Sequence, residues 1–367
     1  MRIRGWVAAL ITTLMMASTS LPAFAHFAAQ TPQFTLQHVI PVSGTQMVQD
    51  SAGDLFILTA KGNVVRLSAT GQAVQTYSLH ATSIAVSSDG STLYALQGAS
   101  SSADETVGSS IAIINTQTGS IENTISSSKW QDPVRILLSP GGNTLYVLDT
   151  QTERVYAVST QTGNVIWSIN TGIGTYSNVG TDMVLSPDGQ TLYVPGYDQI
   201  PNFDTTMKFG FAAVTLPLQS SATISIKGSD VVDGIIPASD GSTVYVLNRG
   251  TDLYSPSVIA YNTQTDHVLN KWKSKLLSEP MTATLMGNDL MVANKKDIAI
   301  LDTQSGSVLG VISNHQFRQI NALVASPDQS TLYALTTNGL FEYSENVATA
   351  QTSNSPVPPS PPAPPSN

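Results

Sequence analysis

Short apolar runs separated by turn residues recur along most of the chain. In each copy an apolar run precedes an Asp-Gly turn or its equivalent, and a second run with a central marker residue follows, as in SPDGQTLYV from Ser186. An Asp-Gly pair between two apolar runs is a strong hairpin signal. The marker residues are Phe56, Tyr94, Tyr146, Tyr193, Tyr245, Met291 and Tyr333, which lie 38, 52, 47, 52, 46 and 42 positions apart. The pattern therefore predicts seven repeats.

Each repeat predicts four strands. The first run, such as RILLS at 135–139, is continuously apolar, which is typical of a strand covered on both faces. After the marker strand, a third strand closes in a tight corner such as NTQTG at 115–119, and a fourth strand follows, such as NVIWSIN at 164–170. Repeats of this length with four strands are typical of propeller blades. The expected fold is an all-β, seven-bladed propeller of four-stranded antiparallel blades.

The two ends of the repeat region complement each other. The seventh repeat stops before its fourth strand, whereas an unassigned strand, FTLQHVI at 34–40, precedes the first repeat. We expect the amino-terminal strand to complete the last blade, because closure removes sheet edges that would otherwise pair with other chains. The alternative is an open solenoid, but the ends lack the polar capping repeats that solenoids need.

Two repeats carry polar insertions, at residues 97–110 and 197–221. The second insertion replaces the usual corner with an extended connection. Long loops on a rigid scaffold are frequent sites of function, but we favour the alternative that these insertions are drift in tolerant surface loops.

Both termini differ in composition from the repeats. Residues 1–25 resemble a cleavable signal peptide, with Arg2 and Arg4 before an apolar run and AFA at 23–25, which predicts His26 as the first mature residue. A membrane anchor is the alternative, but the run is shorter than the ~20 residues of a spanning helix. We expect the propeller to occupy residues 26–348. Residues 349–367 are rich in proline and are interpreted as a disordered tail or a spacer.

The charge and the lack of cysteine exclude several classes of partner and chemistry. Only 11% of the residues are charged, less than half of the about 25% of an average protein. Without residues 1–25 the chain has 14 basic and 25 acidic residues, so nucleic acid is not an expected partner. The chain has no cysteine, which excludes disulfides and thiolate chemistry. Because Ser, Thr, Gln and Asn dominate the polar surface, we hypothesise that the fold tolerates acid.

Charged residues near the first strands are the candidates for a site in the axial pocket. The acids Asp132, Asp182, Asp233 and Glu279 occur in four successive repeats, with Arg135 and Arg318 nearby. A partial acidic ring of this kind would bind a cation such as Ca²⁺, for which Asp182 and Asp233 are the candidate ligands, or would polarise a small substrate. The acids lie eleven, twelve or fourteen residues before their markers. Solvated carboxylates that cap turns are therefore the alternative.

Other common site motifs give no stronger candidate. The five histidines are far apart and lack the spacing of a zinc site. The sequence has no Gly-x-Ser-x-Gly nucleophile elbow, and GIGTYSNVG from Gly172 lacks the lysine of a phosphate-binding loop.

The repeat resembles that of the YVTN-type seven-bladed propellers of bacterial and archaeal surface proteins, through SPDGQTLYV and the TQTG corners. The resemblance covers most of residues 34–345. In addition, RVYAVSTQTGNVIWSI at 154–169 is similar to the repeat of pyrroloquinoline quinone enzymes, in which a Trp docks one blade on the next; only Trp167 and Trp272 fit that role here. These resemblances imply a fold and leave the activity open, because propellers host many functions.

Together these features predict a monomeric binding or scaffolding module that is secreted to the cell exterior. Its partner would be a protein or a cell-surface ligand, with no membrane span after cleavage of the signal peptide and no required cofactor. The alternative is a lactonase-like hydrolase with a divalent cation in the axial pocket.

Overall fold

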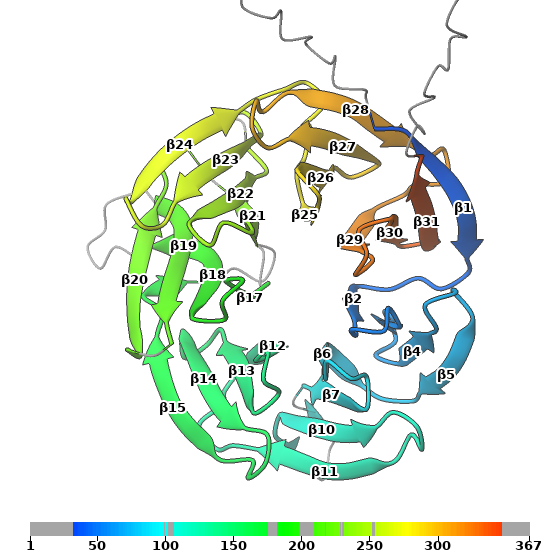
Figure 1. Ribbon diagram of the computed structural model, residues 1–367. Helices are drawn as coiled ribbons and strands as arrows, with labels where there is room; N and C mark the ends of the chain where they lie inside the picture. Colours follow the sequence, from blue (N-terminus) through cyan, green and yellow to red (C-terminus); the bar gives the residue numbers. More distant parts are fainter. Residues whose placement is uncertain are drawn as a thin grey trace, which may run out of the picture. The chain divides into compact units, whose positions relative to one another are not determined.

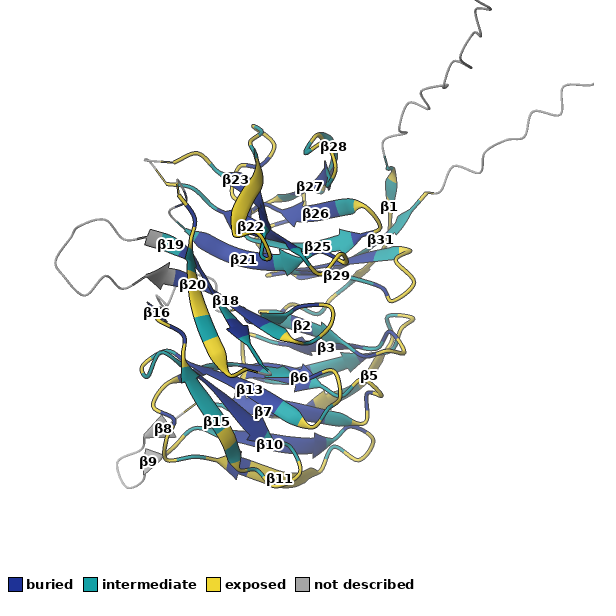
Figure 2. Ribbon diagram, turned by 60° about the vertical axis from the view of Figure 1, so that its left-hand side comes forward, coloured by how far each residue is buried: buried dark blue, intermediate teal, exposed yellow. Residues whose placement is uncertain are grey.

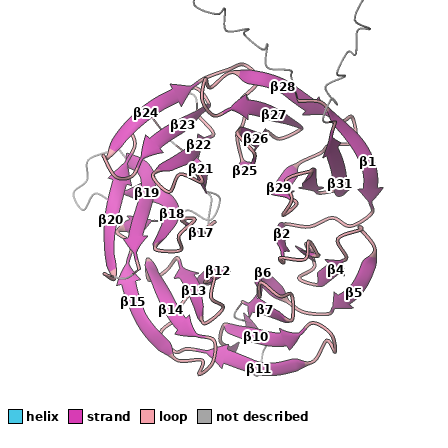
Figure 3. Ribbon diagram, in the orientation of Figure 1, coloured by secondary structure: helices cyan, strands magenta, loops and turns pink. Residues whose placement is uncertain are grey.

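Seven antiparallel sheets stand around a central axis in the computed structural model of the chain (Figure 1). The structure describes residues 32–346 except 99, 102–105, 175–181, 199–207, 217, 228, 230 and 252–253. Within this part the chain forms strands and turns without a helix (Figure 3), and therefore contains no helix that is long and apolar enough to cross a membrane. The predicted signal peptide and proline-rich tail lie outside the described residues. The prediction of an all-β seven-bladed propeller is confirmed.

The strands of each blade follow one another outward from the axis. Blade one contains β2 (Gln46–Gln49), β3 (Leu55–Leu58), β4 (Val64–Leu67) and β5 (Ala73–Tyr77). Blade two contains β6 (Ala81–Val86), β7 (Thr92–Gln97), β10 (Ser110–Asn115) and β11 (Ile121–Ser126). Blade three contains β12 (Pro133–Leu138), β13 (Thr144–Asp149), β14 (Arg154–Ser159) and β15 (Val165–Asn170).

The remaining blades keep this order. Blade four contains β17 (Val184–Leu185), β18 (Thr191–Asp198), β19 (Lys208–Thr215) and β20 (Ser220–Ser225), and β16 (Ile173–Gly174) pairs with the end of β18. Blade five contains β21 (Val232–Pro237), β22 (Thr243–Asn248), β23 (Ser257–Asn262) and β24 (His267–Trp272). Blade six contains β25 (Thr282–Met286), β26 (Asp289–Ala293), β27 (Asp297–Asp302) and β28 (Val308–Ser313). Blade seven contains β29 (Ile320–Ala325), β30 (Thr331–Thr336), β31 (Gly339–Glu345) and β1 (Phe34–Ile40).

The amino-terminal strand β1 is the outermost strand of blade seven. It pairs antiparallel with β31, from Phe34 opposite Glu345 to Ile40 opposite Leu340, with one register shift between Leu36 and His38. In Figure 1 the dark blue β1 lies along the outer side of β31. The last blade is thus built from both ends of the repeat region, so the ring of sheets has no gap between blade seven and blade one.

Both predicted insertions contain strands. Residues 100–107 include a short hairpin of β8 (Ser100–Ser101) and β9 (Thr106–Val107). Within 197–221, which was interpreted as an extended loop, β19 and part of β20 form regular strands. The reason is the apolar segment FGFAAV, whose Phe211 is fully buried and meets Tyr193 and Tyr261 edge-on, with ring centroids 5.9 and 5.7 Å apart.

The hydrophobic core lies between neighbouring blades. Each buried cluster draws side chains from two adjacent sheets, as where Phe211 of blade four meets Val246 and Tyr261 of blade five. Figure 2 shows the middle strands of the blades, such as β13 and β22, as mostly buried, innermost strands such as β25 and β29 as largely intermediate, and the outer strand β20 as largely exposed. A large side chain that is fully buried in this way contributes about 1.5–3 kcal/mol, so the ring is stabilised by burial in the absence of disulfides.

The recurring SPDG sequence is a hydrogen-bonded turn between the first and second strands. Ser186 Oγ donates to Asp188 Oδ1 (2.5 Å) and accepts the Thr191 amide (2.9 Å). Ser326 and Ser87 make the same two kinds of contact in their own turns. These motifs are therefore structural, as expected from turn chemistry.

The turn carboxylates also determine how the fold responds to acid. Hydrogen bonds from Ser87 and Ser91 lower the pKa of Asp89 to about 2, and hydrogen bonds led by those from Ser186 and Ser326 lower the pKa values of Asp188 and Asp328. A carboxyl with a lowered pKa in the folded state stabilises the fold above its unfolded pKa, and this stabilisation is lost as pH falls through the folded pKa.

We expect these turns to cost the protein no stability between pH 7 and pH 4. The free energy of unfolding should fall only below the ordinary Asp pKa of 3.8, toward the pKa of about 2 for Asp89. Asp289 works in the opposite direction, because burial and then the nearby Asp302 and Glu345 raise its pKa, so its protonation favours the folded state. Urea unfolding at pH 7, 5, 4, 3 and 2 measures the profile, and a steep loss between pH 6 and pH 4 would contradict it.

Two other residues of the repeat join neighbouring blades. Marker tyrosines are hydrogen-bonded to the corner threonine of the next blade: Tyr94 to Thr160, Tyr193 to Thr263 and Tyr245 to Thr303. The corner glycine of a blade lies against a side chain from the fourth strand of the blade before it: Gly71 against Ile40, Gly119 against Gln75, Gly163 against Ile125 and Gly306 against Trp272. In this contact, Ile40 of β1 has the same role as residues of β5, β11 and β24.

Candidate binding pocket on the propeller axis

The first strands of six blades surround a pocket of about 250 Å³ on the axis. Its lining comes from blade one and blades three to seven, near the starts of their innermost strands. The strands of a blade alternate in direction, so these starts lie on the side that carries the loops between blades and the loops between second and third strands. We call this side the pocket face, and the opposite side, which carries the SPDG turns and the corners, the turn face.

The blades present equivalent residues to the axis. In six blades, one residue of the first strand pairs with the residue two positions after the marker: Gln46, Ser83, Arg135, Gly234, Thr282 and Ala322. In blade four, Val184 pairs with the marker Tyr193, which places Asp182 at the equivalent point. Arg135 and Asp182 therefore occupy the same position on neighbouring blades, and this shared register brings them together.

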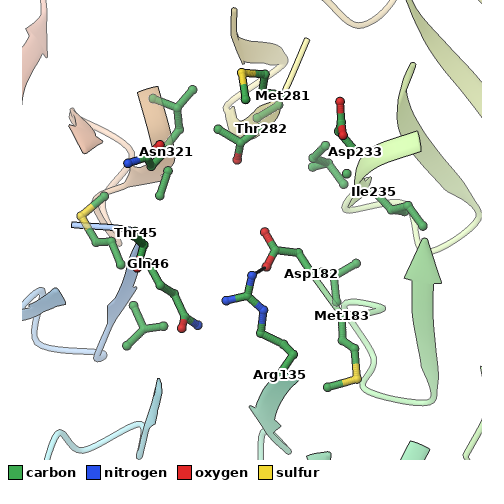
Figure 4. A pocket seen from close by; sticks show the side chains of 18 of the residues that line it. Thr45, Gln46, Arg135, Asp182, Met183, Asp233, Ile235, Met281, Thr282 and Asn321 are labelled. Atoms are coloured by element: carbon green, nitrogen blue, oxygen red, sulfur yellow. Dashed lines mark ion pairs between the residues drawn. The ribbon is translucent and has the colours of Figure 1, made fainter. Parts of the chain in front are cut away.

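Arg135 and Asp182 form an ion pair inside the pocket. The Arg135 side chain is 17% exposed, whereas that of Asp182 is 61% exposed. Figure 4 shows the two charged groups pointing toward each other near the middle of the pocket. Arg135 Nε is buried and has no hydrogen-bond partner among the described residues. The pair places one buried cation and one accessible carboxylate on the axis.

Asp233 lines the pocket but directs its carboxylate to Arg249. Arg249 Nε and Nη2 each lie 2.5 Å from an oxygen of Asp233, whose side chain is only 5% exposed. The hydrogen bond to Asp233 raises the pKa of Arg249 against the opposing effect of burial. In Figure 4 the Asp233 carboxylate points away from Asp182. Asp233 and Asp182 therefore do not converge on a common point.

The other three candidate residues lie outside this pocket lining. Asp132 is exposed, and its carboxylate accepts a hydrogen bond from the Thr150 hydroxyl (2.6 Å). Glu279 is exposed, and its amide donates to Asn294 Oδ1 (3.2 Å). Arg318 is exposed in the loop that precedes β29. The sequence thus predicted three of the lining residues, whereas the exposed Asp132 carboxylate is hydrogen-bonded to the Thr150 side chain outside the pocket lining.

Polar pocket residues that the sequence reasoning missed connect the first strands to one another. Gln46 forms two hydrogen bonds with the backbone of Ile84 (3.0 and 2.9 Å), and Asn321 Nδ2 donates to Gly44 O (2.7 Å). One sequence signal for pocket-lining positions was available, because Arg135 and Asp182 both lie eleven residues before their marker residues. Gln46 lies ten residues before its marker because its turn is shorter, so a fixed spacing does not find it.

The residues of the pocket do not fit a calcium site. Ca²⁺ takes six to eight oxygen ligands, whereas Asp182 and Asp233 are each engaged by a guanidinium and do not converge. In the part of the chain that the structure describes, no three His, Cys, Asp or Glu residues form a group that would hold a metal. A pyrroloquinoline quinone does not fit either, because the pocket lining contains no aromatic ring to stack on it.

The two pocket aspartates are expected to differ in their effect on stability. Asp233→Ala should lower the free energy of unfolding by about 2 kcal/mol, because it removes a 5% exposed carboxylate that accepts two hydrogen bonds from Arg249. Asp182→Ala should lower it less, by about 1 kcal/mol, because this carboxylate is 61% exposed and water in the pocket would replace it beside Arg135. Urea unfolding of both variants measures the difference, and equal midpoints would contradict it.

Comparison with known proteins shows likeness of fold. Residues 27–169, which include β1 and blades one to three, match a family model described as outer membrane protein assembly factor BamB. This match covers less than half of the chain. The model describes repeats of the pyrroloquinoline quinone type. The resemblance to YVTN-type propellers stays a prediction. No curated protein matches the chain.

Among solved structures, Kuenenia stuttgartiensis hydrazine synthase matches with a TM-score of 0.64 and 16% identity, over 83% of this chain and 95% of that chain. Because 1528 chains match in total, this likeness shows the propeller fold and carries no activity over to this protein.

Proposed function

We propose that this chain is an exported binding module whose pocket face holds a protein partner. The observation that carries the proposal is the pairing of both pocket carboxylates with arginines. A metal site needs several converging oxygen ligands, which Asp182 and Asp233 do not provide, whereas the accessible Asp182 carboxylate and Arg135 present an acceptor and donors to a docking group. The match to a family model described as an assembly factor also supports contact with other proteins.

The ring is rigid, so its binding surface is already formed before a partner docks. Side chains such as Gln46 and Asn321 join the first strands around the axis, and buried clusters join the sheets. A rigid surface loses little conformational entropy when a partner docks, so more of the contact energy is retained as affinity. A cation-dependent hydrolase, the alternative predicted from the sequence, would need converging oxygen ligands that Asp182 and Asp233 do not supply.

Site-specific photo-cross-linking in the source cells tests the module. A photoreactive residue is placed at Lys61 or Lys296 on the pocket face, and at Gln264 on the turn face as the matched control; all three positions are exposed. We expect a discrete protein adduct from at least one pocket-face position and none from Gln264. If no position gives an adduct, or if both faces give the same adducts, the proposal is wrong.

Export is part of the proposal and has its own measurement. Residues 1–25 have the composition of a signal peptide, so the protein recovered from outside the cytoplasm should begin at His26. Mass spectrometry of the intact protein reads the amino terminus directly. A chain that keeps residues 1–25 and stays in the cytoplasm would contradict export while leaving the binding test unaffected.

A further inference from the structure

We propose that the pocket face of blades five to seven docks an acidic, partly apolar segment of a partner protein. This inference rests on the proposed function and adds to it the location and chemistry of the contact. It follows from the distribution of charge, from a groove next to the cations, and from two exposed apolar side chains at the same place.

Positive charge is concentrated on one sector of an acidic protein. Seven of the 16 lysines and arginines lie between residues 249 and 318, although the whole chain has a net charge of −9. On the turn face, by contrast, the turns between first and second strands and the corners between third and fourth strands contain no lysine or arginine. They contain aspartates: Asp50, Asp54, Asp89, Asp188, Asp240, Asp266 and Asp328.

Five of these cations form what we call the basic patch: Lys273, Lys275, Lys295, Lys296 and Arg318. All five are exposed. The four ion pairs found in the described part of the chain include none of them. Glu279 shares a loop with Lys273 and Lys275, and Asp297 follows Lys296. The five cations still outnumber these two acids, and an acidic partner would neutralise the excess positive charge.

Two hydrogen bonds hold the loops of the basic patch side by side. Asn294 Nδ2 donates to the carbonyl of Leu276 (2.8 Å), which joins the loop between β24 and β25 to the loop between β26 and β27. The Ile320 amide lies 3.3 Å from the carbonyl of Lys295, which joins that second loop to the start of β29. The cations are therefore on neighbouring loops of one face.

A groove of about 500 Å³ lies beside two of these lysines. Lys273 and Lys275 line it together with Ser255, Ser278 and Pro256. Ammonium and hydroxyl groups are suited to carboxylates, because each donates hydrogen bonds to an anionic oxygen. The groove thus has donors for the acidic side chains of an extended segment.

Apolar residues next to the groove favour a protein partner over a simple polyanion. Leu276, which follows Lys275 in the chain, is 47% exposed, and Tyr254, which precedes Ser255 of the groove lining, is 44% exposed. A polyphosphate or an acidic sugar polymer has little to bury against them, whereas a leucine or an aromatic residue of a peptide does. A second copy of this chain fits less well, because aspartates of its turn face such as Asp89 and Asp328 already accept hydrogen bonds within their own turns.

Binding of a synthetic peptide tests this contact. The probe is a fluorescent 12-residue peptide of the repeated sequence Glu-Leu-Glu-Ser, measured by anisotropy with the mature chain at about 50 mM salt, where surface charges are weakly screened. The patch variant is Lys273→Glu with Lys275→Glu. The matched control is Lys61→Glu with Lys129→Glu, which changes the charge equally at exposed positions of other blades.

We expect saturable binding that is roughly tenfold weaker in the patch variant and unchanged in the control variant. Leu276→Ser should weaken binding of this peptide and leave binding of a 12-residue polyglutamate unchanged. Equal affinity of wild type, patch variant and control variant overturns the proposal. Polyphosphate that competes as well as the peptide at equal charge also overturns it, in favour of a general anion surface.

Three further outcomes separate this proposal from the alternatives. If sedimentation shows self-association that the patch variant abolishes, the occupant is a second copy and the proposal is wrong. If cross-linking identifies a partner that the patch variant still binds, the proposed binding function is supported and the proposed docking site is wrong. If cross-linking identifies no partner, the proposed function fails whatever the peptide does.

Discussion

Deletion of residues 33–40 is expected to abolish cooperative folding of the propeller. The deletion removes β1, and with it the ladder of hydrogen bonds to β31, each worth about 1 kcal/mol. It also removes Phe34 from the cluster between blades six and seven that buries Phe341 and Tyr343, and leaves the corner at Gly71 without Ile40. The loss should exceed about 5 kcal/mol, which is comparable with the whole stability of many domains.

The measurement is a thermal melt followed by circular dichroism, with rescue as its control. A synthetic peptide of residues 32–42, added to the truncated chain during refolding, should restore a cooperative transition, and a scrambled peptide of the same composition should not. A truncated chain that melts cooperatively at the temperature of the intact protein would show that blade seven does not depend on β1.

Gly306→Ala is expected to destabilise the protein by about 3 kcal/mol, the sum of a backbone cost and a packing cost. Gly306 has φ of +71°, where a Cβ is disfavoured, and a Cβ at this position would overlap the indole ring of Trp272. The ring does not move aside easily, because it stacks on Tyr245 with ring centroids 5.9 Å apart.

Gly241→Ala provides the matched control for this substitution. Gly241 has φ of +70° and a Cβ there would meet no atom within 4 Å, so only the backbone cost of about 1–2 kcal/mol is expected. In a Trp272→Ala background, Gly306→Ala should cost no more than this control. Urea unfolding of Gly306→Ala, Gly241→Ala, Trp272→Ala and the Trp272→Ala, Gly306→Ala double variant measures these differences. If Gly306→Ala and Gly241→Ala lower the stability of the parent chain equally, the contact with Trp272 contributes nothing.

Much of the fold follows from local sequence. The SPDG turns, the TQTG corners and the apolar first strands form from interactions between residues close in the chain, so the number of blades and the order of strands were predicted without the structure. The segment FGFAAV within residues 197–221 was misjudged as loop because it lacks the usual corner, although its buried Phe211 makes it part of a blade.

The pocket was predicted less completely. Arg135, Asp182 and Asp233 were found because they lie at or near the starts of apolar first strands, but the Arg249 that neutralises Asp233 lies in a loop after the second strand of its blade. No spacing rule relates these two residues, since the contact depends on where each loop turns over the sheet. The cations of the basic patch were not predicted as a group for the same reason.

The sequence by itself determined an all-β ring of seven four-stranded blades, because each repeat contains the turns and apolar strands that its own hairpins need. Tertiary structure alone decided which charges meet. Arg135 and Asp182 are 47 residues apart in the chain, and they form a pair because two separate blades present the same register to one axis. A contact of this kind depends on how complete sheets are placed around that axis, and local sequence does not encode this placement.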